Sequence, residues 1–454
     1  MAVSLRRRDR DMTDGNIAKL LIAFSIPLLI GNIFQQLYNT VDSIIVGNYV
    51  SKQALAAVGC TGPIINALIG LFAGLSSGAG VVISQFYGAK DDEKLHSSVQ
   101  TAIGLTLIMC VVITAMGVLL TPAMLRMMDT PADVFPEAAE YLRIYFWGIS
   151  GMMIYNIGAG ILRAVGDSTR PLYFLIFSAV MNTILDVVLV RNCAMGIAGA
   201  AVATIISQAL SALLVMGLLS RAKTAYRVEL LKIKMSGRIL RKICDIGIPS
   251  ALQLAITAFS NIFVQSYINR FESSCMAGWT AYNKIDSFAM LPMMSLSIAI
   301  STFVGQNLGA GKLERAHTAP KYGLIMGLTF MAVMLVPLML FAPVLTRLFN
   351  SEPEVVQFGT LFIRMISPFY IAFAINQVYL GALRGAGDTR SAMFITLGSF
   401  VVFRQIYLFI AYRLGGGITA IALGYPAGWA LCSALLLAYY YGFGKKRVTR
   451  QLTM

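Results

Sequence analysis

The sequence predicts an all-α polytopic membrane protein with twelve transmembrane helices in two six-helix lobes, and three observations support this class. The 454 residues are 57% hydrophobic and only 13% charged, whereas a soluble domain carries about 25% charged residues. Apolar stretches of about 20 residues, the length that spans a bilayer, recur along the whole chain. The second half of the chain also repeats motifs of the first. Soluble enzymes, fibrous proteins and disordered chains are excluded by this composition, and outer-membrane barrels by the lack of a two-residue alternation.

The apolar stretches define the expected elements in chain order. We place the twelve spans at residues 17–48, 53–84, 97–122, 136–162, 169–191, 194–220, 240–270, 277–306, 317–346, 355–383, 391–413 and 416–443. The first stretch has no small-residue cleavage site and therefore reads as a true span. The expected domains are an N-terminal segment, an N-lobe, an inter-lobe loop, a C-lobe and a basic tail, at residues 1–16, 17–220, 221–239, 240–443 and 444–454.

The basic residues predict the orientation in the membrane. The chain has 36 Lys and Arg against 21 Asp and Glu, a net charge of +15. The basic residues gather in one set of alternate loops, which includes both termini and the stretch from Arg221 to Lys242. Cytoplasmic loops carry such an excess. We therefore expect both termini in the cytoplasm and a multi-pass protein in the inner (plasma) membrane of a bacterium or archaeon.

The two halves repeat each other at an offset of 221 to 222 residues. Ser-Ile-Pro at 25–27 matches Gly-Ile-Pro at 247–249, and the Leu-Arg-x-x-Gly-Asp motif at 162–167 returns at 383–388. Repeats of six spans each are parallel and are typical of secondary transporters, whose substrate site lies between the lobes. There is no nucleotide-binding Gly-rich loop, so an ion gradient is the expected energy source.

Several conspicuous residues have plain structural interpretations. His96 and His317, the only histidines, occupy equivalent loop positions and are interpreted as hydrogen-bonding anchors rather than pH sensors. Arg163 and Arg384 of the repeated motif are expected to bond carbonyls at helix ends. The cysteines, spaced for neither disulfides nor a metal site, are interpreted as small buried hydrophobic residues: Cys60, Cys110, Cys193, Cys244, Cys275 and Cys432.

The first half contains two acids inside expected spans, Asp42 and Asp186. Ionisable residues in lipid are costly and indicate function. Helical spacing places oxygen-bearing side chains on the same face as each acid: Asn32, Gln35 and Asn39 with Asp42, and Ser178 and Asn182 with Asp186. The expected span 194–220 adds the hydroxyl of Thr204. Oxygen ligands suit Na⁺ or H⁺. Helix-to-helix hydrogen bonds contribute only about 0.6–2 kcal/mol in membranes, less than the cost of about 2.5–3.5 kcal/mol for a central acid, so cation coupling is favoured over structural bonding.

The second half does not repeat these acids. Val264 or Gln265 stands at the position of Asp42, and Tyr407 lies near that of Asp186. Two alternatives remain open for the charged residues that it carries instead, internal ion pairing or contact with substrate: Lys284, Asp286 and Arg404. Further cavity candidates are Tyr155, Met290, Gln377 and Tyr379, because aromatic rings attract organic cations and Met surfaces adapt to many shapes. Core packing is the plain alternative for each of them.

Four motifs carry a resemblance to a known family: residues 36–47 (Gln-Leu-Tyr-Asn-Thr-Val-Asp-Ser-Ile-Ile-Val-Gly), 162–167, 195–201 and 383–388. The chain resembles the multidrug and toxic compound extrusion (MATE) transporters over essentially its whole length. The resemblance implies two six-helix lobes in a V that opens alternately to each side. It also implies a cation site in the N-lobe at Asp42, Asn182, Asp186 and Thr204, and a hinge at Pro27.

The resemblance also implies the activity. Such transporters exchange organic cations and drugs outward for H⁺ or Na⁺ inward. We therefore expect a transporter rather than an enzyme, a monomer in the lipid bilayer with small organic cations or drugs as partners, no nucleic acid and no cofactor. No metal is expected beyond possible Na⁺ at the N-lobe site. Thr257 and Phe373 stand where the NorM-like branch has second-lobe acids, which favours the DinF-like or MepA-like branch.

Two rival functions were weighed against this one. The first is a flippase for a lipid-linked or anionic amphiphilic substrate of the same superfamily, motivated by Lys284 and Arg404, whose cations would suit a phosphate. The second is a membrane sensor or membrane-embedded enzyme. The duplication and the N-lobe acids argue against the second, and no catalytic dyad stands out in the sequence.

Overall fold

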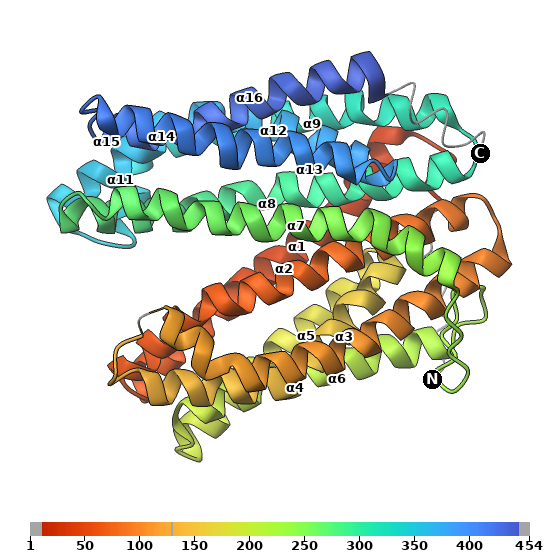
Figure 1. The fold of residues 1–454 in the computed structure, drawn as a ribbon, viewed down its shortest axis with the longest axis horizontal. Coiled ribbons are helices and arrows are strands. Elements are labelled where there is room, and N and C mark those ends of the chain that lie inside the picture. The colour runs from red at the N-terminus through yellow and green to blue at the C-terminus, as the bar shows by residue number, and fades with distance from the viewer. Residues whose placement is uncertain (1–10, 129, 445–454) are drawn as a thin grey trace. The chain divides into compact units, whose positions relative to one another are not determined.

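The computed structural model describes residues 11–128 and 130–444, without the side chains of residues 43, 52, 53, 55, 56, 63, 66 and 67, and this part of the chain is helical (Figure 1). The first half contains α1 Ile17–Tyr49, α2 Lys52–Gly88, α3 Asp92–Met127, α4 Phe135–Ala164, α5 Thr169–Asp186 with the π-helix η1 Val187–Asn192, and α6 Gly196–Ser220. These elements confirm the all-α class and the first six predicted segments.

The second half contains α7 Gly237–Ile268, α8 Ser273–Gly309, α9 Leu313–Leu340, α10 Ala342–Arg347, α11 Pro353–Ile366, η2 Ser367–Phe369, α12 Tyr370–Gly385, α13 Thr389–Leu397, η3 Gly398–Phe403, α14 Arg404–Arg413, α15 Ile418–Ala422, α16 Gly424–Tyr439 and η4 Tyr440–Gly444. The predicted span 355–383 is therefore two helices joined by a 3₁₀ turn at Pro368. The predicted span 391–413 is interrupted by the π-helix η3, and the predicted span 416–443 is divided at Leu423 and ends in the π-helix η4. Such local irregularities leave no clear trace in hydropathy.

Eleven helices of the described chain are long and apolar enough to cross a membrane. The predicted span 136–162 corresponds to α4, which is 30 residues long but is not one of the eleven. Its first turns carry Glu137, Glu140 and Arg143, which lower its hydropathy. The chain is thus a multi-pass membrane protein.

Several helices extend beyond the predicted spans because polar residues cap them. The α3 helix begins at Asp92 rather than near residue 97, and the Asp91 side chain accepts a hydrogen bond from the Lys94 backbone amide at 3.0 Å. A side-chain acceptor at this position satisfies one of the amides that a helix N-terminus leaves unpaired. Hydropathy detects the apolar stretch of a helix but not its polar ends.

The chain divides into two compact units that do not follow the loops. Of the described residues, unit 1 holds 26–251 with Asp11, and unit 2 holds 12–25 with 252–444. Two helices therefore change unit along their length, α1 between Ser25 and Ile26 and α7 between Ala251 and Leu252. Both changes fall within two residues of a repeated proline, Pro27 or Pro249, and each helix is continuous there.

Close backbone contact fixes the first half of α7 within unit 1. A Cβ atom added at Gly247 would lie 2.9 Å from the Cα of Leu75 on α2. Small residues allow helix backbones in membranes to approach in this way. The loop before α7 is anchored as well, because His96 Nδ1 lies 3.2 Å from the Ala225 carbonyl oxygen. This contact agrees with the interpretation of His96 as a loop anchor.

The segment before α1 is bound to unit 2 by hydrogen bonds to α8 and to the start of α9. The Met12 amide donates to Gln306 Oε1 at 3.0 Å, and Asn307 Nδ2 donates to the Met12 carbonyl at 3.0 Å. Lys312 pairs with Asp14 at 2.5 Å. The start of the described chain therefore belongs to the packed body of unit 2.

The repeated Leu-Arg-x-x-Gly-Asp motifs form turns through their glycines and aspartates. Gly166 and Gly387 have φ of 89° and 81°, a region that residues with a Cβ rarely adopt. Asp167 Oδ1 accepts hydrogen bonds from two amides of α5 at 3.0 Å. The expectation for the arginines is wrong, since neither Arg163 nor Arg384 donates to a carbonyl of the described residues. The aspartates already serve the turn.

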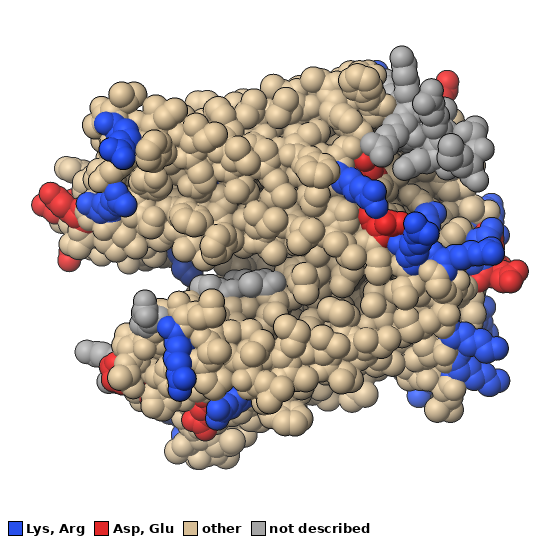
Figure 2. Space-filling view, in the orientation of Figure 1, with Lys and Arg blue, Asp and Glu red and all other residues tan. Residues whose placement is uncertain are grey.

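Charged side chains and cysteines agree broadly with a protein that lies in lipid. On the face drawn in Figure 2, charged side chains gather near helix ends and uncharged side chains cover the helix middles.

Cys110, Cys275 and Cys432 are buried, and none of the six cysteines is paired. Cys193 is exposed, which corrects the expectation of uniform burial, because it lies in the turn after η1.

Candidate functional site

The acids of the first half converge inside unit 1. Asp42 lies late in α1, and Asp186 is the last residue of α5, where the helix becomes the π-helix η1. The exposed fractions are 9% for Asp42 and 0% for Asp186, and their carboxyl groups lie within hydrogen-bonding reach of each other. π-Helical turns are frequent at functional sites. Two sequence positions 144 residues apart thus form one carboxyl pair.

This carboxyl pair lacks hydrogen-bond donors. Asp42 Oδ1 and both carboxyl oxygens of Asp186 are buried without a donor from the described residues, and so is Asn182 Oδ1. Asn182 Nδ2 instead donates to Thr204 Oγ1 at 3.5 Å. Buried acceptors are normally satisfied, and exceptions indicate a missing partner such as an ion. The cluster of Asp42, Asn182, Asp186 and Thr204 could therefore take a proton or a hard cation through its oxygens.

Two tyrosines near the acid pair were missed by the sequence analysis. Tyr38 on α1 and Tyr141 on α4 both lie close to Asp42 and Asp186. Tyr38 was detectable, because it precedes Asp42 by four residues and so shares its helix face. Tyr141 was not, since only the packing of α4 brings it near the acids.

The supporting residues expected on the polar faces have separate surroundings. Ser178 donates to the Ser207 carbonyl at 3.0 Å and so joins α5 to α6. Asn39 is exposed, and Gln35 lines a cavity with Asn32 rather than contacting Asp42 as part of a buried stripe. Pro27 lies inside the continuous helix α1 and lines the same cavity.

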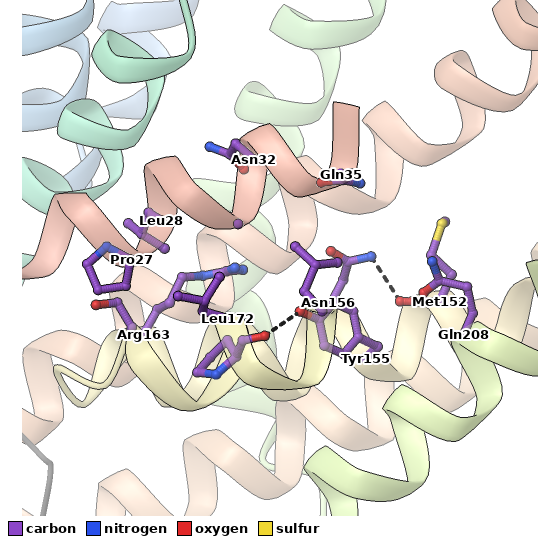
Figure 3. A pocket seen from close by; sticks show the side chains of 14 residues that line it. Pro27, Leu28, Asn32, Gln35, Met152, Tyr155, Asn156, Arg163, Leu172 and Gln208 are labelled. Carbon is purple, nitrogen blue, oxygen red and sulfur yellow. Dashed lines mark hydrogen bonds between the residues drawn. The ribbon is translucent and has the colours of Figure 1, made fainter. Parts of the chain in front are cut away.

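This cavity, of about 70 Å³, lies among α1, α4, α5 and α6 within unit 1 (Figure 3). Its polar lining includes Asn32, Gln35, Asn156, Arg163 and Gln208. Tyr155, an expected cavity residue, lines it as well, and its hydroxyl donates to the Pro171 carbonyl at 3.0 Å.

Unit 2 provides its own acid with hydrogen-bond donors. Asp286 Oδ1 accepts hydrogen bonds from the hydroxyls of Tyr370 at 2.6 Å and Tyr282 at 3.1 Å. Neither Lys284 nor Arg404 forms an ion pair with Asp286 among the described residues, so the internal pairing weighed from the sequence is not observed. Lys284 is exposed, because it lies only two residues from Asp286 and a helix turns that position away.

Arg404 is 3% exposed and has partners from α7. Its Nη2 donates to Ser260 Oγ and to Asn261 Oδ1, both at 2.8 Å, while Nε is left without an acceptor. The guanidinium carbon also lies 4.8 Å from the centre of the Tyr425 ring. Both neutral oxygen acceptors and an aromatic face thus stabilise this buried cation.

The other expected cavity residues of unit 2 are mainly packed into the helices. Tyr379 is 1% exposed, and its hydroxyl lies 3.0 Å from that of Tyr441. Met290 is half-buried, and so is Gln377, whose backbone carbonyl accepts a hydrogen bond from Ser297 at 2.7 Å. Phe373 packs against Trp429 with a centroid distance of 5.6 Å. No group of three or more potential metal-ligating acids, histidines or cysteines occurs in the described residues.

The duplicated helical fold in the membrane, with an unsatisfied carboxyl pair in one unit only, defines the class of membrane transporters built from two repeats. The chain belongs to the MatE family, whose model matches residues 27–188 and 249–410. The two matched segments are offset by 222 residues (249 minus 27, and 410 minus 188), which confirms the duplication. This family comprises membrane transporters rather than enzymes.

Individual proteins agree with this assignment. The chain is 32% identical to the probable multidrug resistance protein YpnP of Bacillus subtilis (strain 168), over 98% of this chain and 99% of that protein. It is 25% identical to an FAD transporter of Shewanella oneidensis, over 85% of this chain and 86% of that protein. A MOP superfamily transporter structure from Pyrococcus furiosus superposes with a TM-score of 0.91 at 24% identity, covering 98% of this chain and 99% of that chain, and so shares the fold.

Proposed function

We propose that this protein is a secondary active antiporter that exports organic cations or drugs in exchange for H⁺ or Na⁺. One observation carries the proposal, the buried carboxyl pair of Asp42 and Asp186 without donors. Two carboxylates about 4 Å apart repel each other by about 4 kcal/mol at an effective dielectric of 20. A proton or Na⁺ bound at the pair relieves that repulsion. The name of the Bacillus relative supports drugs as substrates.

In this mechanism Asn182 and Thr204 complete the oxygen set, and Pro27 serves as the hinge. Asp42 and Pro27 lie on the same helix, α1, which changes compact unit directly before Pro27. Pro27 has no backbone amide to donate and so weakens the helix locally. A change of charge at Asp42 therefore acts on the helix that both units share. Coupling requires that substrate and cation bind with different affinities in the two transport states.

The proposed setting is the inner membrane, with both termini in the cytoplasm, as the basic loops predict. The protein acts as a monomer, and its only auxiliary species is the coupling ion. Five side chains of unit 2 are the proposed substrate contacts, with Arg404 as a buried neighbour: Lys284, Asp286, Met290, Gln377 and Tyr379.

A second candidate function is export of an anionic amphiphile, including flipping of a lipid-linked one. Lys284 favours it, because this exposed cation forms no ion pair with a described residue. The Shewanella relative is named for FAD, a dinucleotide that carries phosphates. Arg404 gives it less support, since Ser260 and Asn261 already occupy its Nη2.

Transport in inside-out vesicles tests these functions. Uptake of a fluorescent organic cation is followed under an imposed H⁺ gradient and then under an imposed Na⁺ gradient, with Asp42→Asn alongside. Uptake under one gradient that is lost in the variant would support the antiporter and identify its coupling ion. Undiminished uptake by Asp42→Asn would overturn the assigned cation site. Uptake of labelled FAD or lipid-linked sugar, without uptake of the organic cation, would favour the second function.

A further inference from the structure

A conspicuous cation in unit 1 has no part in the mechanism above. Arg163 is half-buried near the end of α4, and its side chain extends along the cavity toward Asn156 (Figure 3). Its guanidinium makes no hydrogen bond or ion pair with any described residue. None of the fourteen residues that line the cavity is acidic. A buried cation without a counter-ion is costly, so this arginine calls for an explanation.

The cavity leads toward the acid pair through Gln208. Gln208 lines the cavity and lies within hydrogen-bonding reach of the Tyr38 phenol. Tyr38 in turn lies beside Asp42 and Asp186. The polar groups of Asn32, Gln35 and Asn156 line the cavity between Gln208 and Arg163 (Figure 3). A series of polar side chains thus connects the carboxyl pair to a fixed positive charge within one unit.

The position of Arg163 relates this charge to one side of the membrane. Arg163 immediately precedes the turn that joins α4 to α5, and the basic-loop pattern assigns that turn to the cytoplasm. A cation that moves between the acid pair and the cytoplasm along this series passes close to the guanidinium, because Arg163 lines the same cavity as Gln208. Arginines placed in narrow membrane pathways exclude protons and other cations by this means.

We propose that Arg163 is an electrostatic gate on the cytoplasmic route to the acid pair, an inference that rests on the proposed cation coupling. The positive charge opposes entry of cytoplasmic H⁺ or Na⁺ into the cavity while the transporter is at rest. Pro27 and Gly31 of α1 line the same cavity, so bending of α1 changes the surroundings of the gate. The gate thereby limits cation flow that is not coupled to substrate.

The repeat supplies a matched control. Arg384 occupies the equivalent motif position in unit 2, and it too has no acceptor for its Nε. Unit 2 has no carboxyl pair at the repeated positions, because Val264 or Gln265 stands at the position of Asp42 and Tyr407 lies near that of Asp186. If the two arginines only shaped the turn of the motif, replacing either one would have the same effect. A gating role concerns Arg163 alone.

Passive dissipation of a cation gradient tests the gate. Vesicles with the purified protein are loaded with a pH-sensitive or Na⁺-sensitive dye, and decay of an imposed gradient is recorded without substrate. Arg163→Gln is expected to accelerate the decay of the gradient at least about fivefold, the lower range of site-to-site coupling. Vesicles with Arg163→Lys or Arg384→Gln should lose the gradient at the wild-type rate. Asn156→Asp places a carboxylate in the cavity and is also expected to accelerate the decay of the gradient. This variant tests the gate if Arg163→Gln does not fold.

The outcomes separate the gate from the proposed function. Wild-type decay rates in both Arg163→Gln and Asn156→Asp would overturn the gate. Equal acceleration in Arg384→Gln would overturn it as well, because that result indicates disturbed packing of the motif. Gradient-driven export by the wild type is measured in the same vesicles, so failure of the antiporter is seen independently of the leak.

Discussion

The two units carry the same six-helix repeat but treat their buried charges in opposite ways. In unit 1, Asp42 and Asp186 are brought together, and three of their carboxyl oxygens have no donor. In unit 2, Tyr282 and Tyr370 supply donors to Asp286, and Arg404 has acceptors from α7. In this comparison unit 2 supplies Asp286 and Arg404 with partners from its own side chains, although Nε of Arg404 and Nε of Arg384 have no acceptor among the described residues. Unit 1 contains the acceptor site that we propose a proton or Na⁺ completes.

The repeat-related positions make the same contrast. Asp42 corresponds to Val264 or Gln265, and Gln265 accepts a hydrogen bond from Trp279 and donates one to Asn269, at 3.1 and 2.7 Å. Near the position of Asp186, Tyr407 donates to the Ala420 carbonyl at 3.1 Å. Both halves thus keep the helices of the repeat, while only the first half has acids at these positions.

The largest expected effect is the loss of transport when either acid of the pair is replaced. Asp42→Asn and Asp186→Asn are each expected to reduce gradient-driven export to background, a loss of more than roughly tenfold. The double variant should be no worse, because residues that act as a unit are not additive. Asp286→Asn is the control for unit 2 and should keep coupling, with any change confined to substrate affinity. Uncoupled transport by Asp286→Asn, with normal transport by Asp42→Asn, would reverse the assignment of the units.

The next effect is on stability in unit 2. Tyr370→Phe removes the shorter hydrogen bond to Asp286 and should lower the free energy of unfolding by about 1 kcal/mol, within the range for bonds to charged groups after allowance for partial exposure. Tyr282→Phe removes the longer bond and should cost less. Thermal unfolding in detergent measures both. The reverse order would contradict the hydrogen-bond geometry.

Ser260→Ala removes an acceptor from the buried Arg404. This substitution should lower the free energy of unfolding by an amount similar to or smaller than that of Tyr370→Phe. Ser260 Oγ accepts hydrogen bonds from Arg404 Nη2 and Gln405 Nε2, at 2.8 and 2.9 Å. Interhelical hydrogen bonds in membranes contribute about 0.6 kcal/mol on average, and a lower midpoint of thermal unfolding is expected. Ser266→Ala is the control, since Ser266 is exposed and donates only within its own helix. Equal shifts in both variants would show that Arg404 does not depend on Ser260.

An effect of comparable size but opposite sign is expected at the acid pair. Asp186→Asn should raise the midpoint of thermal unfolding slightly, by about 0.5–1 kcal/mol in stability, because it removes one of two buried like charges that have no donors. Functional sites are commonly stabilised by substitutions that abolish activity. Addition of the coupling ion should stabilise the wild type but not this variant. A variant less stable than the wild type would indicate that the pair is a structural element.

Apolar stretches predicted the spans, repeated motifs predicted the duplication, and helical periodicity predicted the faces that present Asp42, Asn182 and Asp186. Each such face depends on residues within a few turns of one another, where spacing along the chain fixes position in space. The same reasoning could not assign partners to Asp286 or Arg404. Tyr282 lies one turn before Asp286, but Tyr370 lies 84 residues from Asp286 and Ser260 lies 144 residues from Arg404 in the chain. The sequence offers several equally plausible distant partners for a buried charge.

The division of α1 and α7 between the compact units also lay beyond local pattern. Hydropathy is continuous through Pro27 and Pro249, and which unit a half-helix joins depends on close contacts such as that of Gly247 with Leu75. Composition and periodicity thus establish that this chain is a duplicated membrane transporter with two acids in its first half. Whether a buried charge is satisfied or left open depends on atoms from distant segments, because hydrogen bonds act only over about 3 Å. Packing alone therefore distinguishes the acceptor site of unit 1 from the satisfied charges of unit 2.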